Sequence, residues 1–287
     1  MTPEANPDQP LLSLRLSVSY PNKPGVLKNL SFGIRRGEIV GLVGESGSGK
    51  STLAMAILRL LDRKNASATG EILFEGIDLF TKKEKELREI RGRKISVVLQ
   101  SPLTSLNPAL KIGTQLREAW RAHATTSREE AATAIREALS NVRLPSDDEF
   151  LSRRVSQLSV GQGQRVTIAM AILHRPALLI ADEATSALDT ITQSEILQLF
   201  RRLNQDLGTA ILYISHDLLS VAAICQRVAI LYEGEIAECD TPEMIFATPR
   251  HAYTRRLVAA LPARPAVNEN AAEIGSPEGL VTADLGS

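Results

Sequence analysis

Cysteine is scarce in this chain: only Cys225 and Cys239 occur among its 287 residues. Two isolated thiols match no zinc or redox spacing, and such scarcity is typical of a protein from a reducing compartment. We therefore expect both cysteines to be ordinary core or surface residues rather than parts of a site.

The chain also lacks an excess of charge and a long apolar run. Basic and acidic residues number 33 each, so the overall charge does not indicate a nucleic-acid-binding protein. The longest apolar runs, such as 177–181, are far too short to cross a bilayer. The polar N-terminus (MTPEANPDQP) does not resemble a signal peptide. We expect a soluble chain, so that work at a membrane would need other chains to span it.

The apolar pattern predicts an α/β protein. Residues 12–18 alternate leucine or valine with serine or arginine, which is the period of a half-buried antiparallel strand. Later strands are short continuous apolar runs, typical of strands covered on both faces. We expect a parallel core with an antiparallel β attachment. The other predicted strands span 38–43, 70–74, 95–100, 177–181 and 210–214, and the predicted helices span 50–61, 112–123, 127–141, 159–173 and 188–207.

Two segments differ in composition from this core. Residues from about 101 to 160 are mostly helical in pattern and polar, and we interpret them as a helical subdomain inserted into the core. After Pro262 the chain has few large apolar residues, so we expect 263–287 to be a disordered tail.

A dense run of charge occupies residues 82–94. Within it, Glu84 and Arg88, and also Glu89 and Arg93, stand four positions apart, the spacing at which helical side chains pair. The segment therefore predicts a solvated helix face rather than a nucleic-acid patch.

The clearest motif is GESGSGKS at 44–51, which fits G-x-x-x-x-G-K-[ST] between a predicted strand and an apolar helix. Glycines let backbone N–H groups turn toward bound phosphates, and the helix N-terminus adds its positive dipole end. We expect Lys50 to reach the β- and γ-phosphates and Ser51 to ligate Mg²⁺. Both flanks disfavour the alternative, a Gly-rich turn with a chance lysine. The predicted nucleotide-binding residues are Gly44, Glu45, Ser46, Gly47, Ser48, Gly49, Lys50, Ser51 and Thr52.

Two acids follow the apolar run 177–181, in the sequence ALLIADE. A buried strand that ends in two acids is unusual unless the acids have partners. Asp182 would hold Mg²⁺ directly or through water, and Glu183 would act as the general base for an attacking water or orient it. An acid pair that merely caps the next helix is the alternative, which the phosphate-binding loop disfavours.

Taken together, six motifs resemble the nucleotide-binding subunit of ABC transporters, in that family's order and over roughly residues 11–262. The resemblance implies a P-loop NTPase (RecA-like) core with an antiparallel β subdomain and an inserted α-helical subdomain. It implies ATP and Mg²⁺ as cofactors, and ATP hydrolysis coupled to transmembrane transport. The motifs are 44–51, Gln100, 158–162, 182–183, 186–189 and His216.

The same resemblance assigns roles to isolated residues. Gln100 is similar to the residue that senses Mg²⁺ and water and links the site to a membrane partner. His216, in YISHD, is similar to the residue that contacts the γ-phosphate, and Asp189 to the loop residue that faces the other subunit. Tyr20 is similar to the aromatic that stacks on adenine, and an aromatic of the strand core is the open alternative. The expected catalytic residues are Lys50, Gln100, Glu183 and His216, and the expected metal-binding residues are Ser51, Gln100 and Asp182.

Two further stretches are similar to the oligopeptide, dipeptide and nickel importer branch of that family: 100–108 (QSPLTSLNP) and 248–257 (TPRHAYTRRL), the latter within an extension at about 236–262. The branch implies two transmembrane permease subunits, an extracytoplasmic solute-binding protein, and a place on the cytoplasmic face of the plasma membrane. Many members carry a cysteine cluster near the C-terminus, and no cysteine follows Cys239. We therefore expect no iron–sulfur centre.

Other functions are less consistent with the sequence. A soluble ABC-type ATPase acting on nucleic acid or ribosomes commonly has tandem cassettes, zinc cysteines or long coiled coils, and this sequence has none of them. A non-catalytic subunit is disfavoured because Lys50, Asp182, Glu183 and His216 are all present. An exporter is disfavoured by the importer-like stretches and the lack of a fused membrane domain. The sequence names neither the cargo nor the second ATP-binding chain.

The stretch 158–162 (LSVGQ) resembles the signature loop, which caps the γ-phosphate held by a second ATP-binding subunit in a head-to-tail dimer. Ser159 offers a hydroxyl at a helix start, Gly161 permits close backbone approach, and Gln162 completes the motif. Val160 replaces the first glycine of the usual LSGGQ. A β-branched residue resists positive φ and adds bulk, so one hypothesis is a weakened site on the partner's nucleotide. The alternative is a valine with ordinary backbone angles that points away.

Overall fold

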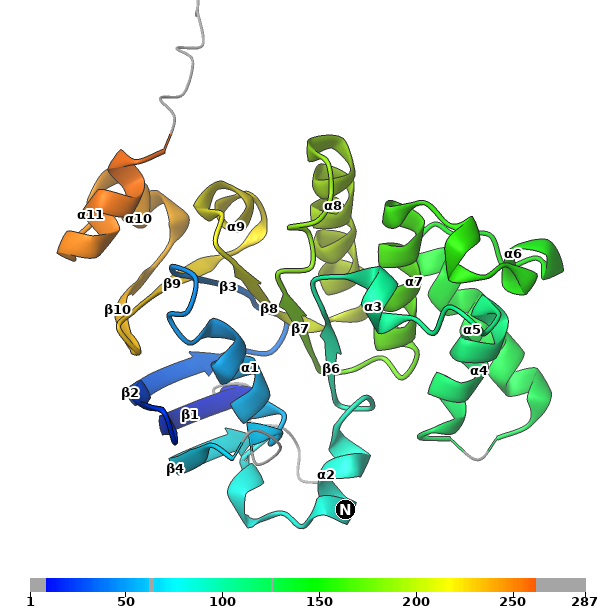
Figure 1. The fold of residues 1–287 in the computed structure, drawn as a ribbon, viewed down its shortest axis with the longest axis horizontal. Helices are drawn as coiled ribbons and strands as arrows, with labels where there is room; N and C mark the ends of the chain where they lie inside the picture. Colours follow the sequence, from blue (N-terminus) through cyan, green and yellow to red (C-terminus); the bar gives the residue numbers. More distant parts are fainter. Residues whose placement is uncertain (1–8, 62–64, 125, 262–287) are drawn as a thin grey trace, which may run out of the picture.

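The computed structural model describes residues 9–61, 65–124 and 126–261. Two β-sheets lie side by side with helices around them (Figure 1). The predictions made for residues 1–8 and for the tail 263–287 lie outside the described residues.

The larger sheet forms the core and has the strand order β10-β9-β3-β8-β7-β6. All neighbouring strands from β9 through to β6 pair in parallel, and β10 pairs antiparallel with β9 at one edge. This arrangement confirms the predicted parallel core. The strands are β3 (Ile39–Val43), β6 (Ile95–Val98), β7 (Leu178–Asp182), β8 (Ala210–Ser215), β9 (Arg227–Tyr232) and β10 (Glu235–Asp240).

The smaller sheet is antiparallel and has the order β2-β1-β4-β5. In β1 the leucines and valines at alternate positions are buried while the residues between them are more exposed, as the period of two predicted. The attachment of this sheet to the parallel core confirms the predicted fold class. Its strands are β1 (Leu12–Tyr20), β2 (Lys23–Ile34), β4 (Ser67–Phe74) and β5 (Ile77–Asp78).

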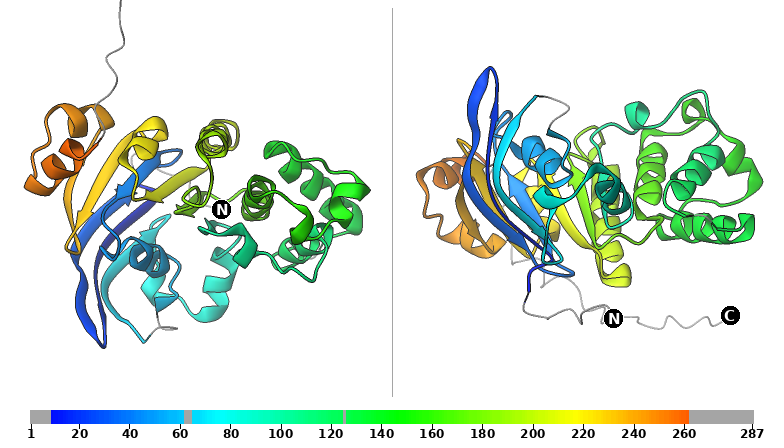
Figure 2. Two further views of the ribbon diagram at one scale, coloured as in Figure 1. Left: turned by 45° about the horizontal axis from the view of Figure 1, so that its top comes forward. Right: turned by 90° about the horizontal axis from the view of Figure 1, so that it is seen from below.

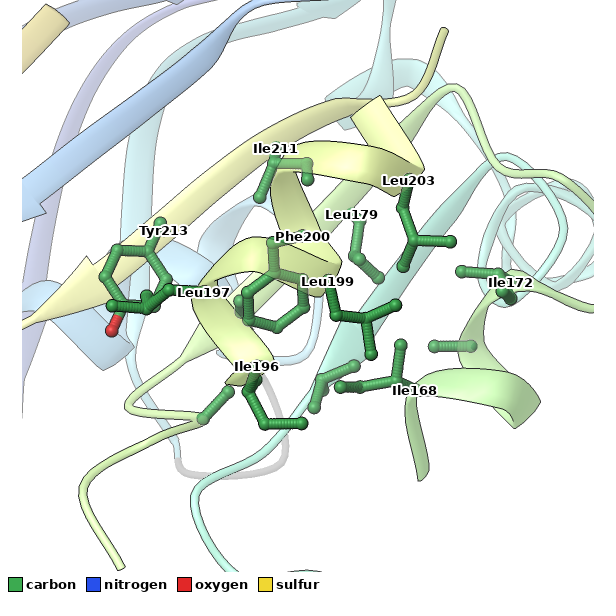
Figure 3. Close-up of a cluster of buried hydrophobic side chains, with 14 of the residues drawn as sticks. Ile168, Ile172, Leu179, Ile196, Leu197, Leu199, Phe200, Leu203, Ile211 and Tyr213 are labelled. Carbon is green, nitrogen blue, oxygen red and sulfur yellow. The ribbon is translucent and has the colours of Figure 1, made fainter. Parts of the chain in front are cut away.

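The core strands are buried on both faces, and alternate residues enter different hydrophobic clusters. In β7, Leu178 and Ile180 pack with the smaller sheet and α1, whereas Leu179 packs with α7 and α8 on the opposite face. Figure 3 shows the cluster that contains Leu179. In it, Phe200 of α8 lies among aliphatic side chains beside Tyr213 of β8. Burial on both faces explains why these strands are continuous apolar runs in the sequence.

Helices cover the sheet and extend from both ends of it. The segment between β6 and α7 contains α-helices and one short 3-10 turn but no strand among its described residues, and it forms one end of the molecule; α10 and α11 lie at the other end (Figures 1 and 2). The helices are α1 (Lys50–Ile57), α2 (Glu84–Ile90), α3 (Pro102–Ser105), α4 (Ile112–Arg121), α5 (Arg128–Asn141), α6 (Asp148–Ser152), α7 (Val160–Ile172), α8 (Thr190–Leu207), α9 (Leu218–Ile224), α10 (Pro242–Ala247) and α11 (Ala252–Ala259), with 3-10 turns η2 (Leu79–Thr81) and η3 (Val155–Gln157).

Several predicted boundaries were wrong. The first helix ends at Ile57 rather than at 61, because the chain turns out of the helix at Arg59, where φ is 53°. The strand predicted over 95–100 ends at Val98, and the next residue, Leu99, is 50% exposed. Both errors follow from extending an apolar run past the point where the backbone turns.

Strands β2, β5, β9 and β10 were not predicted. The hairpin between β9 and β10 turns at Glu233 and Gly234, with φ of 49° and 85°. Two central residues with positive φ are typical of the type I′ turn, which usually contains glycine at its second position. The apolar run 228–231 followed by Glu-Gly was therefore an available signal for this hairpin.

The charged segment 82–94 contains the predicted solvated helix, α2. Arg88 Nε lies 3.4 Å from Glu84 Oε1, and Arg93 Nη1 lies 3.9 Å from Glu89 Oε2, so both pairs form at the predicted i,i+4 spacing. All four side chains are more than half exposed, where such pairs contribute little to stability.

No helix within the described ranges combines the length and the apolar character needed to cross a bilayer.

The two cysteines are ordinary core residues, as expected. Cys225 is buried and Cys239 is partly buried, and both are free thiols. Burial raises the pKa of each thiol, so both stay protonated and unreactive near neutral pH.

Candidate active site

The phosphate-binding loop joins the end of β3 to the start of α1. Gly49 is the N-cap of α1 and has φ of 110°, and Gly47 has φ of 78°. A Cβ atom at Gly49 would lie 2.7 Å from Leu27 Cδ2 and 3.1 Å from Val26 O. Both the backbone angle and the space therefore require glycine at this position.

Lys50 lies beneath this loop as the first residue of α1. Its Nζ donates to Gly44 O at 2.8 Å and to Glu45 O at 3.0 Å, and the residue is only 5% exposed. Burial lowers the pKa of Lys50, against the opposing attraction of Glu183 and Asp182. The loop carbonyls thus hold a buried ammonium group close to both acids.

Glu183 and His216 meet where the parallel strands β7 and β8 end. The Glu183 N–H donates to Ile214 O at 2.9 Å, and Glu183 Oε1 lies 3.6 Å from His216 Nδ1. Glu183 has φ of 49°, a value that costs energy for a residue with a Cβ atom. The sheet register therefore brings these two predicted catalytic residues together.

Asp182 is the last residue of β7 and is held in a partly desolvated position. Burial raises the pKa of Asp182, and the negative charge of Glu183 raises it further. A hydrogen bond from the Ser51 hydroxyl and the positive charge of Lys50 lower the pKa, but the net shift is upward. Its Oδ1 atom is buried and has no hydrogen-bond partner among the described residues. An ionisable oxygen left without a partner beside a serine hydroxyl fits the oxygen donors that Mg²⁺ prefers.

The phosphate-binding loop, Lys50, Asp182 and Glu183 contribute to the lining of a cavity of about 640 Å³, whereas His216, although next to Glu183, is not in that lining within the described residues. Most of the predicted nucleotide-site residues line it, and Gln100 lies in the same lining as Asp182. Tyr20 is there too, at the end of β1, with its hydroxyl 3.3 Å from Thr52 Oγ1. The predicted residues in the lining are Tyr20, Ser46, Gly47, Gly49, Lys50, Ser51, Thr52, Gln100, Asp182 and Glu183.

The lining also contains residues that sequence reasoning missed. Lys23 enters from the first residue of β2, and its Nζ donates to Gly47 O at 3.2 Å. No motif marks this lysine, because its place depends on the hairpin between β1 and β2. The same hairpin brings Val26 into the lining; Leu99 and Ser101 enter from the loop after β6, and Thr104 enters from α3.

The other predicted loop residues lie behind the cavity rather than in its lining. A Cβ atom at Gly44 would lie 2.4 Å from Leu231 O, so glycine lets the loop pass β9. Glu45 O accepts from Ser48 N–H at 3.2 Å, a bond that closes the turn of the loop. The Ser48 hydroxyl is buried without a partner in the described part of the chain.

The motif LSVGQ starts helix α7 at a separate cavity of about 420 Å³. Ser159 is the N-cap: its Oγ accepts from Gln162 N–H at 3.2 Å, and Gln162 Oε1 accepts from Ser159 N–H at 3.1 Å. This reciprocal pair is a capping box, which fixes the first turn of the helix. Ser159, Gly161 and Gln162 share this cavity with Asp189, and none of them is in the lining of the phosphate-loop cavity within the described residues.

Val160 is the first residue of α7 and has helical backbone angles with negative φ. The conformational part of the weakened-site hypothesis is therefore wrong, because no positive φ is required of the valine here. The residue is 42% exposed and lines the cavity beside Ser159. The steric part of that hypothesis stays a prediction.

Gly161 has a reason within this chain to be glycine. A Cβ atom there would lie 2.8 Å from Thr192 Cγ2, on the first turn of α8. The Thr192 hydroxyl in turn donates to Asp189 Oδ2 at 2.7 Å. The start of α7 therefore lies directly against the first turn of α8, which Asp189 caps.

The family model of ABC transporters matches residues 27–186, more than half of the chain. This chain belongs to the ABC transporter family. It is an ATP-binding cassette, and its fold agrees with solved cassettes. One is cbiO1 from Clostridium perfringens, part of the ABC transporter complex cbiONQ, with a TM-score of 0.73, 27% identity, and coverage of 84% of this chain and 92% of that one.

A second solved cassette, MJ0796, has been described as a dimer in a post-hydrolysis state bound to ADP and Pi. It has a TM-score of 0.69 and 30% identity, and the match covers 80% of this cassette and 98% of that chain. Among curated relatives, the glutathione import ATP-binding protein GsiA of Escherichia coli (strain K12) is 43% identical over 246 residues. The match takes in 84% of this chain but 40% of that relative, so the cassette spans less than half of the relative's length.

Replacing Asp182 by asparagine should stabilise the cassette in the absence of nucleotide. The raised pKa means that folding disfavours the ionised carboxylate, so the penalty is present at neutral pH and disappears as the pH falls below the ordinary range of aspartate. We expect D182N to gain about 1 kcal/mol in free energy of unfolding at neutral pH and nothing near pH 3. Urea unfolding at both pH values measures this. A D182N variant that is less stable at neutral pH would contradict the energetic penalty that burial imposes on the ionised carboxylate.

Proposed function

We propose that the chain is the ATP-hydrolysing subunit of an ABC importer for peptides or a related small solute. The single observation that carries the proposal is the cavity in which Lys50, Asp182 and Glu183 surround the end of the phosphate-binding loop. The 43% identity to a glutathione import ATP-binding protein supports the direction of transport and the class of solute.

Within this proposal, the chain's own groups divide the work of hydrolysis. The loop N–H groups and Lys50 bind the phosphates and stabilise the negative charge that develops on them. Glu183 accepts a proton from the attacking water or orients it, and the adjacent His216 contacts the γ-phosphate. Ser51, Asp182 and Gln100 would hold Mg²⁺, which neutralises charge on the phosphate oxygens when it is bound.

A second ATP-binding subunit completes the site. Ser159, Gly161 and Gln162 lie at a cavity of their own with Asp189, so they are available to a nucleotide held by another cassette. The start of α7, with its positive dipole end and the backbone N–H groups of Val160 and Gly161, suits a phosphate. Two cassettes in a head-to-tail arrangement would each supply this helix start to the other.

The remaining partners belong to the importer as a whole. We infer two transmembrane permease subunits, and a solute-binding protein on the far side of the membrane that acts through them. The cassette would then be a peripheral protein at the cytoplasmic face of the plasma membrane. Closure of the cassettes around ATP would reach the permeases through the helical segment after β6 and the Gln100 region.

Replacing Glu183 by glutamine should uncouple binding from hydrolysis. Without the carboxylate, we expect ATP to bind with near-normal affinity and to turn over roughly 100-fold more slowly or worse. The measurements are ATP binding and steady-state ATPase rate on the assembled transporter. E233Q is the matched control, since Glu233 has the same φ of 49° but lies in the β9–β10 turn. Near-normal turnover by E183Q would remove Glu183 from its catalytic role.

Replacing Val160 by glycine tests the steric part of the signature-loop hypothesis. Removing the exposed side chain beside Ser159 should let a partner's nucleotide approach more closely. We expect ATP affinity to rise roughly threefold, equivalent to about 0.7 kcal/mol. The control is M244G, because Met244 is an apolar side chain exposed to a similar extent, 43%, in the first turn of α10. If affinity and ATPase rate do not move, the valine is neutral.

A pulldown with the full-length chain distinguishes an importer subunit from an ATPase that acts on nucleic acid. We expect two permease proteins to co-purify from detergent-solubilised membranes, and their recovery to be unaffected by nuclease. Recovery of nucleic acid or ribosomal proteins in their place would favour the alternative function.

A further inference from the structure

A buried group of hydroxyls lies behind the carboxyl ends of β7 and β8. Tyr213 of β8 is fully buried, and its hydroxyl is 2.7 Å from Thr185 Oγ1 and 3.4 Å from Ser220 Oγ. In Figure 3 the Tyr213 hydroxyl points away from Phe200 and the aliphatic cluster. None of these three residues is in the described lining of the nucleotide cavity, so their hydroxyls do not bind substrate directly.

These hydroxyls connect the two loops that carry the catalytic groups. Thr185 follows Glu183 by two residues, in the loop after β7. On the other side, Ser220 Oγ donates to Asp217 O at 2.9 Å, next to His216. Tyr213 donates to Ser220, so it stands between the two loops.

Ser215, the residue before His216, joins the same group. Its Oγ accepts from Asp217 N–H at 3.0 Å and lies 3.4 Å from Ser220 Oγ. The loop with His216 is therefore held on both sides of the histidine. The side chain of His216 itself is 60% exposed. The backbone at His216 is therefore held by the buried hydroxyls of Ser215 and Ser220 and not by packing of the imidazole.

The loop after β7 needs such a support because Glu183 has a strained backbone. Strained residues persist only where their surroundings determine the conformation fully. The carbonyl of Glu183 accepts from Ser186 N–H at 3.1 Å and from Ser186 Oγ at 3.0 Å. Thr185 is 3% exposed, and within the described part of the chain its hydroxyl bonds only to Tyr213.

A tyrosine is an unfavourable choice for a purely apolar place. Phenylalanine would fill the ring's position beside Phe200, whose centroid is 6.1 Å away, without burying a polar atom. Burial raises the pKa of Tyr213, so its hydroxyl stays protonated and keeps a proton to donate. Tyr213 thus fills a place in the core and, through its hydroxyl, also links Thr185 in the loop after β7 to Ser220 near the loop after β8.

We propose that Tyr213 is a positioning residue, which acts through Thr185 and Ser220 to fix Glu183 relative to His216 for ATP hydrolysis. The inference rests on the proposed function, since it assigns Tyr213 a part in the reaction of the same site. The hydroxyls hold the backbone of both loops, and no proton moves along them during the reaction.

The test is the ATPase kinetics of the assembled transporter with single-hydroxyl variants. Y213F and T185V should each lower kcat by roughly tenfold, because small misplacements of catalytic groups slow a reaction strongly, while the KM for ATP stays within about twofold. T185S keeps the hydroxyl and should restore kcat. The double variant Y213F/T185V should be no slower than either single variant, as expected for two halves of one interaction.

The matched control is T209V, at the opposite end of β8. The Thr209 hydroxyl is buried as well and donates to Pro176 O at 2.9 Å, next to β7. Its loss removes a comparable buried hydrogen bond between the residues that lead into β8 and β7, far from the site, so T209V should keep the wild-type kcat. Thermal unfolding of all variants shows whether the changes in kcat exceed those explained by stability.

The outcomes separate this inference from the proposed function. If E183Q is inactive while Y213F and T185V keep the wild-type kcat, the positioning role is wrong and the catalytic assignment stands. An equal loss of kcat in T209V, or a T185S variant as slow as T185V, also overturns the positioning role. If E183Q itself turns over normally, the catalytic assignment of Glu183 is wrong and Tyr213 has no such group to position.

Discussion

The parallel pairing of β3, β8 and β7 is the constraint on which the site depends. Because the three strands run side by side in the same direction, their carboxyl ends lie at one edge of the sheet. That edge carries the phosphate-binding loop from β3, the two acids from β7 and His216 from β8. A change in register would separate these groups even if every side chain were kept. The short, continuous apolar runs of these strands therefore serve the site by fixing its geometry.

At this edge of the sheet, the charged groups of the protein do not fully compensate one another for the cost of their burial. Lys50 is neutralised in part by Asp182 and Glu183, yet burial still lowers its pKa, and the same burial raises that of Asp182. Each group is more stable when an oppositely charged partner arrives. Under the proposed function, a nucleotide triphosphate and a divalent cation would supply both signs together. The cassette would then gain binding energy from groups that cost it stability when it is alone.

Sequence reasoning located most of the cavity, because its chemistry is carried by short motifs with fixed spacing. The phosphate-binding loop must be glycine-rich to turn, and two acids at the end of a buried strand need a cation or a donor beside them. Lys23 and Val26 were missed because only the pairing of β1 with β2 brings them to the loop. Tyr213 was missed for a similar reason: in the sequence it is one more apolar position of β8. Such contacts depend on long-range register, which periodicity does not encode.

The contact between Gly161 and Thr192 limits what can stand at the start of α7. Any side chain at position 161 would place its Cβ atom 2.8 Å from Thr192 Cγ2. Thr192 in turn donates through its hydroxyl to Asp189, the N-cap of α8. A larger residue at position 161 would therefore have to displace Thr192, and with it one of the hydrogen bonds that cap α8.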